Sequence, residues 1–252
     1  MALQRETWGL RSSEIVPPAV LMIARKTGGV ASGAFDAGGA LLGCVFGLTG
    51  WEGGRLVHWS HLLAVKPSCR DRGVGASLKW HQRAELLALG IDRMMWTYDP
   101  LVARNAHVNI VKLGADVVEY VQDMYPGDDG NLADSVIGSD RFVVSWELQA
   151  PEAERPPDPE DWTSIPLAMI TGDGVGATRR FPTAPLVRVE IPADIQSLKQ
   201  VMPDVARAWR ATTREIFQHY LQRGYRIDVF VRDPEWERCF YVLTRSSNPQ
   251  AA

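Results

Sequence analysis

The chain has few cysteines, no long apolar run and no excess of one charge. Its three cysteines, Cys44, Cys69 and Cys239, are too few and too scattered for a disulfide framework or a zinc site, so we expect no metal. No apolar stretch reaches the roughly 18 residues that a membrane span needs. The stretch over residues 15–35 is interrupted by prolines and basic residues, and we therefore expect no contact with a membrane.

The charge balance points away from nucleic acid. The 252 residues hold 27 Lys and Arg against 30 Asp and Glu, a net charge of -3, and no basic cluster stands out. Binding to phosphate backbones calls for a clustered cationic excess. The first ten residues lack the basic, apolar and small-residue order of a secretory signal. With 46% hydrophobic residues, the sequence predicts a cytoplasmic α/β protein with an ample core.

A proline- and acid-rich stretch divides the chain. Residues 150–166 show no apolar period and are interpreted as a linker between a domain over 1–149 and a smaller unit over 167–252. Hydrophobic spacing predicts the elements on either side. The first half is expected to hold helices over 3–8, 18–25, 74–89 and 103–113, and strands over 29–34, 40–48, 56–65, 91–98, 117–121 and 142–148. The second half is expected to be a β-α-β-β unit, with strands over 186–191, 225–231 and 238–243 and helices over 193–200 and from 203.

One segment carries most of the functional information. A buried strand ending Leu-Ala-Val at Val65 runs into an Arg/Gly loop, which opens directly into an amphipathic helix. Backbone N–H groups at a helix start bind phosphate, and Arg70 and Arg72 add charge beside them. The alternative is that Gly73 and Gly75 merely form a turn. A dinucleotide fingerprint fails because its third glycine position is Leu78, and the Lys-Ser/Thr of a Walker loop is absent.

The pattern Arg-x-x-Gly-x-Gly-Ala after this strand resembles the coenzyme A pyrophosphate loop of the GNAT acetyltransferase superfamily. The resemblance covers roughly residues 3–148, and the segment from Lys112 to Ala115 (Lys-Leu-Gly-Ala) is similar to the one that closes the cofactor site. It implies an α/β (α+β) fold: a mixed, mostly antiparallel sheet flanked by helices, with the C-terminal β-α-β-β unit packed on it. The family usually has an edge strand before the first helix, which this sequence does not show. Either the start is truncated, or the edge is covered by a strand from 186–191 or 225–243 or by a second copy of the chain in a homodimer.

The resemblance also implies a binding mode for acetyl-CoA or another acyl-CoA. Strand 56–65 is expected to part from strand 91–98, so that pantetheine lies between them and its amides pair with main-chain groups of Leu63 and Val65. Asn105, and Asn109 as a polar contact or a core hydrogen bond, are expected near the pantetheine or thiol end. The loop amides would hold the pyrophosphate, at Arg70, Arg72, Gly73, Val74, Gly75 and Ala76.

Catalytic candidates are few. His61, just before Leu63 on the central strand, is the first candidate for the base, because imidazole titrates in the useful range; the alternative is a core histidine. Many members of the family place a tyrosine acid where this chain has Ile110. Tyr98 is therefore the candidate acid, with an aromatic core residue as its alternative and water as another proton source.

The acceptor side is less specific. The polar segment 123–139 is expected to act as a lid, and Arg104 and Arg141 to bind a substrate carboxylate or, alternatively, to form ion pairs. The sequence thus predicts an N-acyltransferase that moves an acetyl or succinyl group to the amine of a small molecule, such as an amino acid. The rival hypothesis is a non-catalytic acyl-CoA-binding sensor or scaffold.

Overall fold

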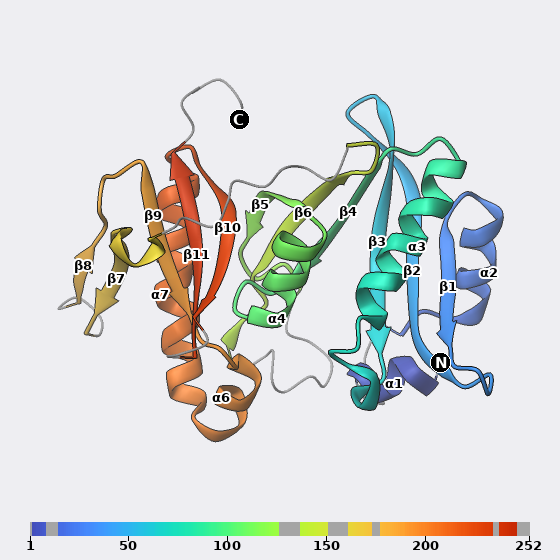
Figure 1. Ribbon diagram of the computed structural model, residues 1–252, viewed down its shortest axis with the longest axis horizontal. Coiled ribbons are helices and arrows are strands. Elements are labelled where there is room, and N and C mark those ends of the chain that lie inside the picture. Colours follow the sequence, from blue (N-terminus) through green and yellow to red (C-terminus); the bar gives the residue numbers. More distant parts are fainter. Residues whose placement is uncertain are drawn as a thin grey trace. The chain divides into compact units, whose positions relative to one another are not determined.

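The computed structural model describes residues 2–8, 15–125, 137–150, 161–172, 177–233 and 237–245. By compactness these residues fall into two units. Unit 1 holds residues 2–8, 15–97 and 144–150, and unit 2 holds the rest from 98 onward. Figure 1 draws the elements of both units along the chain. The domain boundaries predicted from composition stay a prediction, and much of the predicted linker lies outside the described residues.

Unit 1 is a sheet covered by helices on both faces. Its helices are α1 (Ala2–Trp8), α2 (Pro18–Lys26) and α3 (Val74–Ala88), with a short 3-10 turn η1 (Pro67–Cys69). Its strands are β1 (Val30–Phe35), β2 (Leu41–Glu52), β3 (Arg55–Val65), most of β4 (Arg93–Tyr98) and the second half of β6 (Arg141–Glu147). Every element predicted in this part of the sequence is present, within a few residues of its expected ends.

Unit 2 begins with α4 (Ala103–Ala106), which continues as the π-helical segment η2 (His107–Lys112), and β5 (Asp116–Val121). The predicted C-terminal β-α-β-β unit is confirmed as β9 (Leu186–Ile191), α6 (Ile195–Val201), α7 (Pro203–Leu221), β10 (Tyr225–Asp233) and β11 (Arg238–Arg245). Three described elements of unit 2 were not predicted: η3 (Trp162–Ser164) and the strands β7 (Leu167–Thr171) and β8 (Thr178–Arg180).

The strands form two sheets. The first has the order β1-β2-β3-β4-β6-β5, and the second the order β10-β11-β9-β7-β8. The predicted mixed, mostly antiparallel sheet is confirmed, because β1, β2 and β3 pair antiparallel while β3 and β4 pair parallel. The C-terminal strands pair with one another instead of extending the first sheet beside β1. Our expectation that one of them covers this edge is therefore wrong, and coverage by a second copy stays a prediction.

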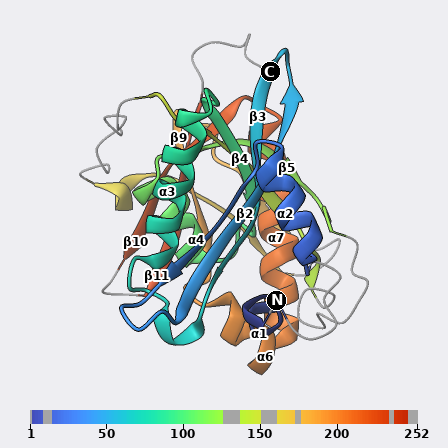
Figure 2. The ribbon, with the colours of Figure 1, turned by 90° about the vertical axis from the view of Figure 1, so that its right-hand side faces the viewer.

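The two faces of the unit 1 sheet bury different residues. On one face Leu3 of α1 and Ala24 of α2 join Phe46, Leu62 and Ala64 in an apolar cluster. On the other face lies α3 (Figure 2), which packs against β1, β2 and β3.

Strand β3 contains a β-bulge. Its pairing with β2 runs Phe46↔Leu62 and then Leu48↔Trp59, so that Ser60 and His61 together oppose the single residue Gly47. An extra residue in one strand shifts which of its side chains face each side of the sheet. Before the bulge, the even-numbered residues of β3 face α3. Beyond it the odd-numbered residues do, while Leu62 and Ala64 join the opposite cluster.

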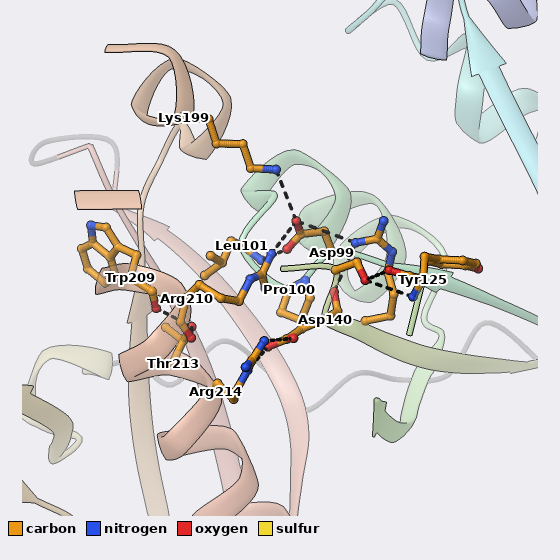
Figure 3. Close-up of polar contacts among 12 residues, drawn as sticks. Asp99, Pro100, Leu101, Tyr125, Asp140, Lys199, Trp209, Arg210, Thr213 and Arg214 are labelled. Atoms are coloured by element: carbon orange, nitrogen blue, oxygen red, sulfur yellow. Dashed lines mark hydrogen bonds and ion pairs between the residues drawn. The ribbon is translucent and has the colours of Figure 1, made fainter. Parts of the chain in front are cut away.

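Unit 2 is held together by buried ion pairs between helix α7 and residues near β4 and β6. Figure 3 shows Arg210 and Arg214 of α7 directed at Asp99 and Asp140. Arg210 Nη2 donates to Asp99 Oδ2 at 2.7 Å, and Arg214 Nε donates to Asp140 Oδ2 at 2.9 Å. The Arg214 guanidinium and the Tyr120 hydroxyl, which both bond to Asp140, lower the pKa of that carboxyl. These pairs dock the C-terminal half onto residues 98–125 and 137–143.

Gly47 gives the first prediction. A Cβ at Gly47 would lie 2.2 Å from His58 Nε2 and 2.6 Å from Trp59 O, both in the middle of the sheet. Gly47→Ala is expected to lower the free energy of unfolding by about 2–3 kcal/mol, the size of an overpacked core. Gly50→Ala in the same strand is the matched control, since a Cβ there meets nothing within 4 Å. Urea titration of both variants checks this, and equal effects would contradict it.

The ion pair between Arg210 of α7 and Asp99 gives the second prediction. In Asp99→Asn, the Arg210 charge stays buried, with a side chain only 3% exposed, and loses its closest anionic partner. We expect a loss of about 3–5 kcal/mol in unfolding free energy. Asp204→Asn is the control on the same helix, because Asp204 is 88% exposed in its pair with Arg207 and should matter little. Thermal or urea unfolding measures both, and a loss below 1 kcal/mol for Asp99→Asn would be evidence against a structural ion pair.

Candidate functional site

Strands β3 and β4 part within unit 1. They pair in parallel at His58↔Met94 and Trp59↔Met95, and from there β3 runs on to Val65 and β4 to Tyr98. On its other edge β3 stays paired with β2 as far as Gly43↔Val65. The bulge lies where the parallel pairing ends. Beyond Trp59, the described residues show no further pairing of β3 with β4.

The predicted loop connects the end of β3 to α3. After η1, Asp71 has φ 60° and Gly73 has φ 81° at the N-cap of α3, where no side chain caps the helix. The first-turn N–H groups of a helix have no partner within the helix and attract anions. Arg70 and Arg72 are exposed beside them. This arrangement suits a phosphate or diphosphate group.

The two loop glycines play different parts. Gly73 adopts the left-handed conformation that side chains disfavour, and a Cβ there would meet nothing within 4 Å. Gly75 has no positive φ, and a Cβ there would make only ordinary contacts with Val65 and Leu63, at 3.7 and 3.8 Å. The protein's own packing therefore does not require glycine at position 75.

Predicted site residues of β3 lie where the strands part. Leu63 and Val65 are half-buried, with side chains on the face toward α3. His61 is exposed at the bulge, and its ring stands edge-on to Phe46 with centroids 6.2 Å apart. Its exposure separates it from a core histidine. Its assignment as a base stays a prediction.

The sequence analysis missed a buried polar relay on the α3 face. Lys79 Nζ donates to Ser60 Oγ at 2.7 Å, and Ser60 Oγ donates to Gln82 Oε1 at 2.8 Å. Gln82 Nε2 lies 2.9 Å from His58 Nε2, and His58 Nδ1 lies 3.0 Å from Thr49 Oγ1. Thr49 Oγ1 donates to the main-chain oxygen of Gly28 at 2.6 Å.

The order of donors in the relay fixes the state of His58. Because the carbonyl of Gln82 accepts from Ser60, its amide NH₂ faces His58 Nε2, which must therefore be an acceptor. The proton of the neutral ring then lies on Nδ1 and is donated to Thr49. Burial, and secondarily the charge of Lys79, lowers the pKa of His58 to about 4, and burial also lowers the pKa of Lys79 well below its ordinary value.

Other predicted residues belong to unit 2. Tyr98 is buried, its ring packs on Phe142, and its hydroxyl accepts from Tyr241 at 3.4 Å. Burial raises the pKa of Tyr98, so these surroundings favour the alternative of an aromatic core residue. Asn105 is half-buried on α4, and Asn109 is buried on η2. Only Asn109 lies in the π-helical segment, where Leu113 N donates to Val108 O at 3.0 Å.

The two predicted carboxylate-binding arginines differ. Arg104 is exposed on α4. Arg141 is only 15% exposed, lies 3.9 Å from Asp99 Oδ2, and stacks over the ring of Tyr125 at 5.2 Å. The ion pair that the sequence left open as the alternative is thus observed for Arg141. Most of the predicted lid over 123–139 lies outside the described residues.

Among the described residues, no group of three or more His, Cys, Asp or Glu is placed to hold a metal ion. In the same part of the chain, no helix combines the length and apolar character needed to cross a membrane.

Comparison with known proteins gives structural likeness only. No protein-family model matches, and no curated protein matches the sequence. Similar solved structures include an IAA acetyltransferase from Bacillus cereus, 15% identical, covering 55% of this chain and 97% of that one with a TM-score of 0.39. The ribosomal-protein-S18-alanine N-acetyltransferase from Escherichia coli is 12% identical over 61% and 89%, with a TM-score of 0.45. A GNAT family acetyltransferase from Elizabethkingia anophelis, solved with acetyl-CoA bound, is 13% identical over 54% and 94%, with a TM-score of 0.39.

The chain's own topology matches the fold that the loop motif implied. A bulged strand β3 parts from its parallel neighbour β4, and an Arg/Gly loop leads from β3 into the uncapped helix α3. A mixed sheet with helices on both faces surrounds this arrangement, and a β-α-β-β unit follows it. The chain therefore has the mixed α/β fold that the resemblance to the GNAT superfamily led us to expect, followed by a C-terminal α+β half.

Proposed function

We propose that this protein is a CoA-dependent N-acyltransferase that moves an acetyl group from acetyl-CoA to the amine of a small molecule. One observation carries the proposal: strands β3 and β4 part beside a bulge, and β3 leads into the Arg/Gly loop before the uncapped helix α3. A more specific version of this proposal has succinyl-CoA as the acyl donor and an amino acid as the acceptor.

The residues of unit 1 fit an acyl-CoA. The N–H groups from Arg70 to Ala76 bind the diphosphate, with the guanidinium groups of Arg70 and Arg72 adding charge. Main-chain groups of Leu63 and Val65 pair with the amides of the pantetheine arm. When bound, acyl-CoA supplies an activated thioester. A main-chain N–H at the bulge donates to the thioester carbonyl oxygen, which gains negative charge as the amine attacks.

Few of the predicted side chains can transfer a proton in this reaction. His61, exposed at the bulge, takes the proton of the attacking amine directly or through a water. Water protonates the leaving thiolate, because Tyr98 is enclosed by Phe142 and Tyr241. Asn105 and Asn109 are proposed contacts for the pantetheine end, and Arg104 and Arg141 are proposed to bind a carboxylate of the acceptor.

Turnover is the direct test. Thiol release from acetyl-CoA and succinyl-CoA is followed with a panel of amines that includes amino acids. An enzyme gives acceptor-dependent release well above background, and the preferred amine names the substrate class. Tight CoA binding with background release for every amine would instead support the sensor or scaffold. A cytoplasmic location and a homodimer stay predictions.

The loop can be tested by binding. We expect the double variant Arg70→Ala and Arg72→Ala to bind CoA about ten-fold more weakly and with a smaller salt dependence, because two charges beside the diphosphate are lost. Isothermal titration calorimetry at two salt concentrations measures this. Arg5→Ala, an exposed arginine on α1, is the matched control. Unchanged affinity in the double variant at low salt would rule out this loop as the diphosphate site.

His61 is tested by kinetics. His61→Ala is expected to lower kcat about a hundred-fold, the size of a lost general base, while the Kd for acetyl-CoA changes little. His81→Ala is the control, because His81 is an exposed histidine on α3 that bonds to Ser32 at 3.1 Å. Equal kcat values for the two variants would remove His61 from the mechanism.

A further inference from the structure

The buried relay joins the bulge to the helix that begins at the phosphate loop. Ser60 is one of the two bulged residues, and its hydroxyl hydrogen-bonds to two side chains of α3, Lys79 and Gln82. With a rise of about 1.5 Å per residue, these two side chains leave α3 about 7.5 and about 12 Å along its axis from Val74. One rigid helix therefore connects the loop to the bulge.

The relay is buried and its hydrogen bonds are matched. His58 and Gln82 are 0% exposed, Lys79 is 2% and Ser60 is 6% exposed. Lys79 Nζ also lies 3.8 Å from the centroid of the Trp96 ring on β4. Buried polar networks of this kind fix a unique arrangement when every member is satisfied, and removing one member leaves its neighbours unpaired.

The relay contacts the bulge through Ser60. Gly47 opposite the bulge has no side chain, and the β4 edge has already parted there. Of the side chains of the two bulged residues, that of His61 is exposed. The hydroxyl of Ser60 is thus the polar side-chain anchor that ties the bulged main chain to α3.

We propose that Lys79, Ser60 and Gln82 are positioning residues, which hold the main-chain groups of the bulge in line with the carbonyl of a thioester bound by the loop. This inference rests on the proposed acyl transfer and deepens it. The three side chains do not touch the reacting atoms. They act through the main chain of β3, so their loss should affect kcat far more than binding of acyl-CoA.

Ser60→Ala is the first test. It removes one oxygen and leaves the volume of the site almost unchanged. We expect kcat to fall at least ten-fold, while the Kd for CoA by calorimetry stays within two-fold, because the loop is untouched. Ser77→Ala is the control, an exposed serine on α3 outside the relay. An unchanged kcat, or a parallel loss of kcat and CoA affinity, would overturn the proposal.

Gln82→Glu gives a spectroscopic readout that does not depend on turnover. A carboxylate facing His58 Nε2 requires a proton on that nitrogen, so the preferred tautomer should change from Nδ1–H to Nε2–H. The nearby anion should also raise the pKa of His58 by at least two units from about 4. Lys79 of α3 is the cation that faces this histidine and opposes the rise. Nitrogen-15 NMR of the histidine ring measures both, and a titration identical to that of the wild type would show that the relay is not formed.

Failure of the proposed function is distinguishable from failure of the relay. If the wild-type protein transfers no acyl group to any amine, the enzyme proposal fails, and the bulge is examined by amide hydrogen exchange. Ser60→Ala should then speed exchange at residues 58–62 at least ten-fold while leaving α1 and α2 unchanged. Unchanged exchange at residues 58–62 would refute the positioning role whatever the activity.

Discussion

The bulge in β3 is the constraint on which the rest of unit 1 depends. By opposing Ser60 and His61 to Gly47, the strand gains one residue over its neighbour, and its even- and odd-numbered side chains exchange faces. Before the bulge, His58 and Ser60 point at α3 and build a polar relay. After it, Leu62 and Ala64 point the other way, into the apolar cluster beneath α1 and α2. A regular strand would have turned these two apolar residues toward α3 and left the opposite cluster without them.

The bulge also determines what the edge of β3 can bind. Parallel pairing with β4 ends at Trp59, yet β3 continues to Val65 and stays paired with β2 over this length. Main-chain N–H and C=O groups that leave a ladder need other partners, and at a half-buried edge those are water or a ligand with matching amides. A pantetheine arm offers such amides, which is why the parted strand and the uncapped start of α3 support the same proposal.

A feature of this molecule could be predicted from the sequence only where residues close together in the chain form a recognisable pattern. The loop was predictable because Arg70, Gly73 and the amphipathic pattern of α3 are local. The relay was not, because Lys79 and Gln82 have the composition of a solvated helix face, and only the fold places them over β3. The bulge leaves no pattern beyond Gly47, whose need for glycine comes from the contact with His58. Strand β8 was missed because all three of its residues are exposed and polar, so no apolar alternation marks it.

The two units bury polar groups in different ways, and the difference matters for the proposed acyl transfer. Unit 2 buries full charges and pairs them, as Asp99 with Arg210 and Asp140 with Arg214, an arrangement that tolerates little movement of α7. Unit 1 instead buries a chain of hydrogen bonds in which His58 is neutral near pH 7. In our proposal this series of hydrogen bonds holds the bulge in position, and none of its members is a carboxylate. An anionic side chain there would oppose negative charge developing on a carbonyl oxygen, whereas matched dipoles leave the stabilisation of that charge to the main-chain N–H groups. A relay that holds no carboxylate is therefore compatible with the proposed acyl transfer at the edge of the sheet.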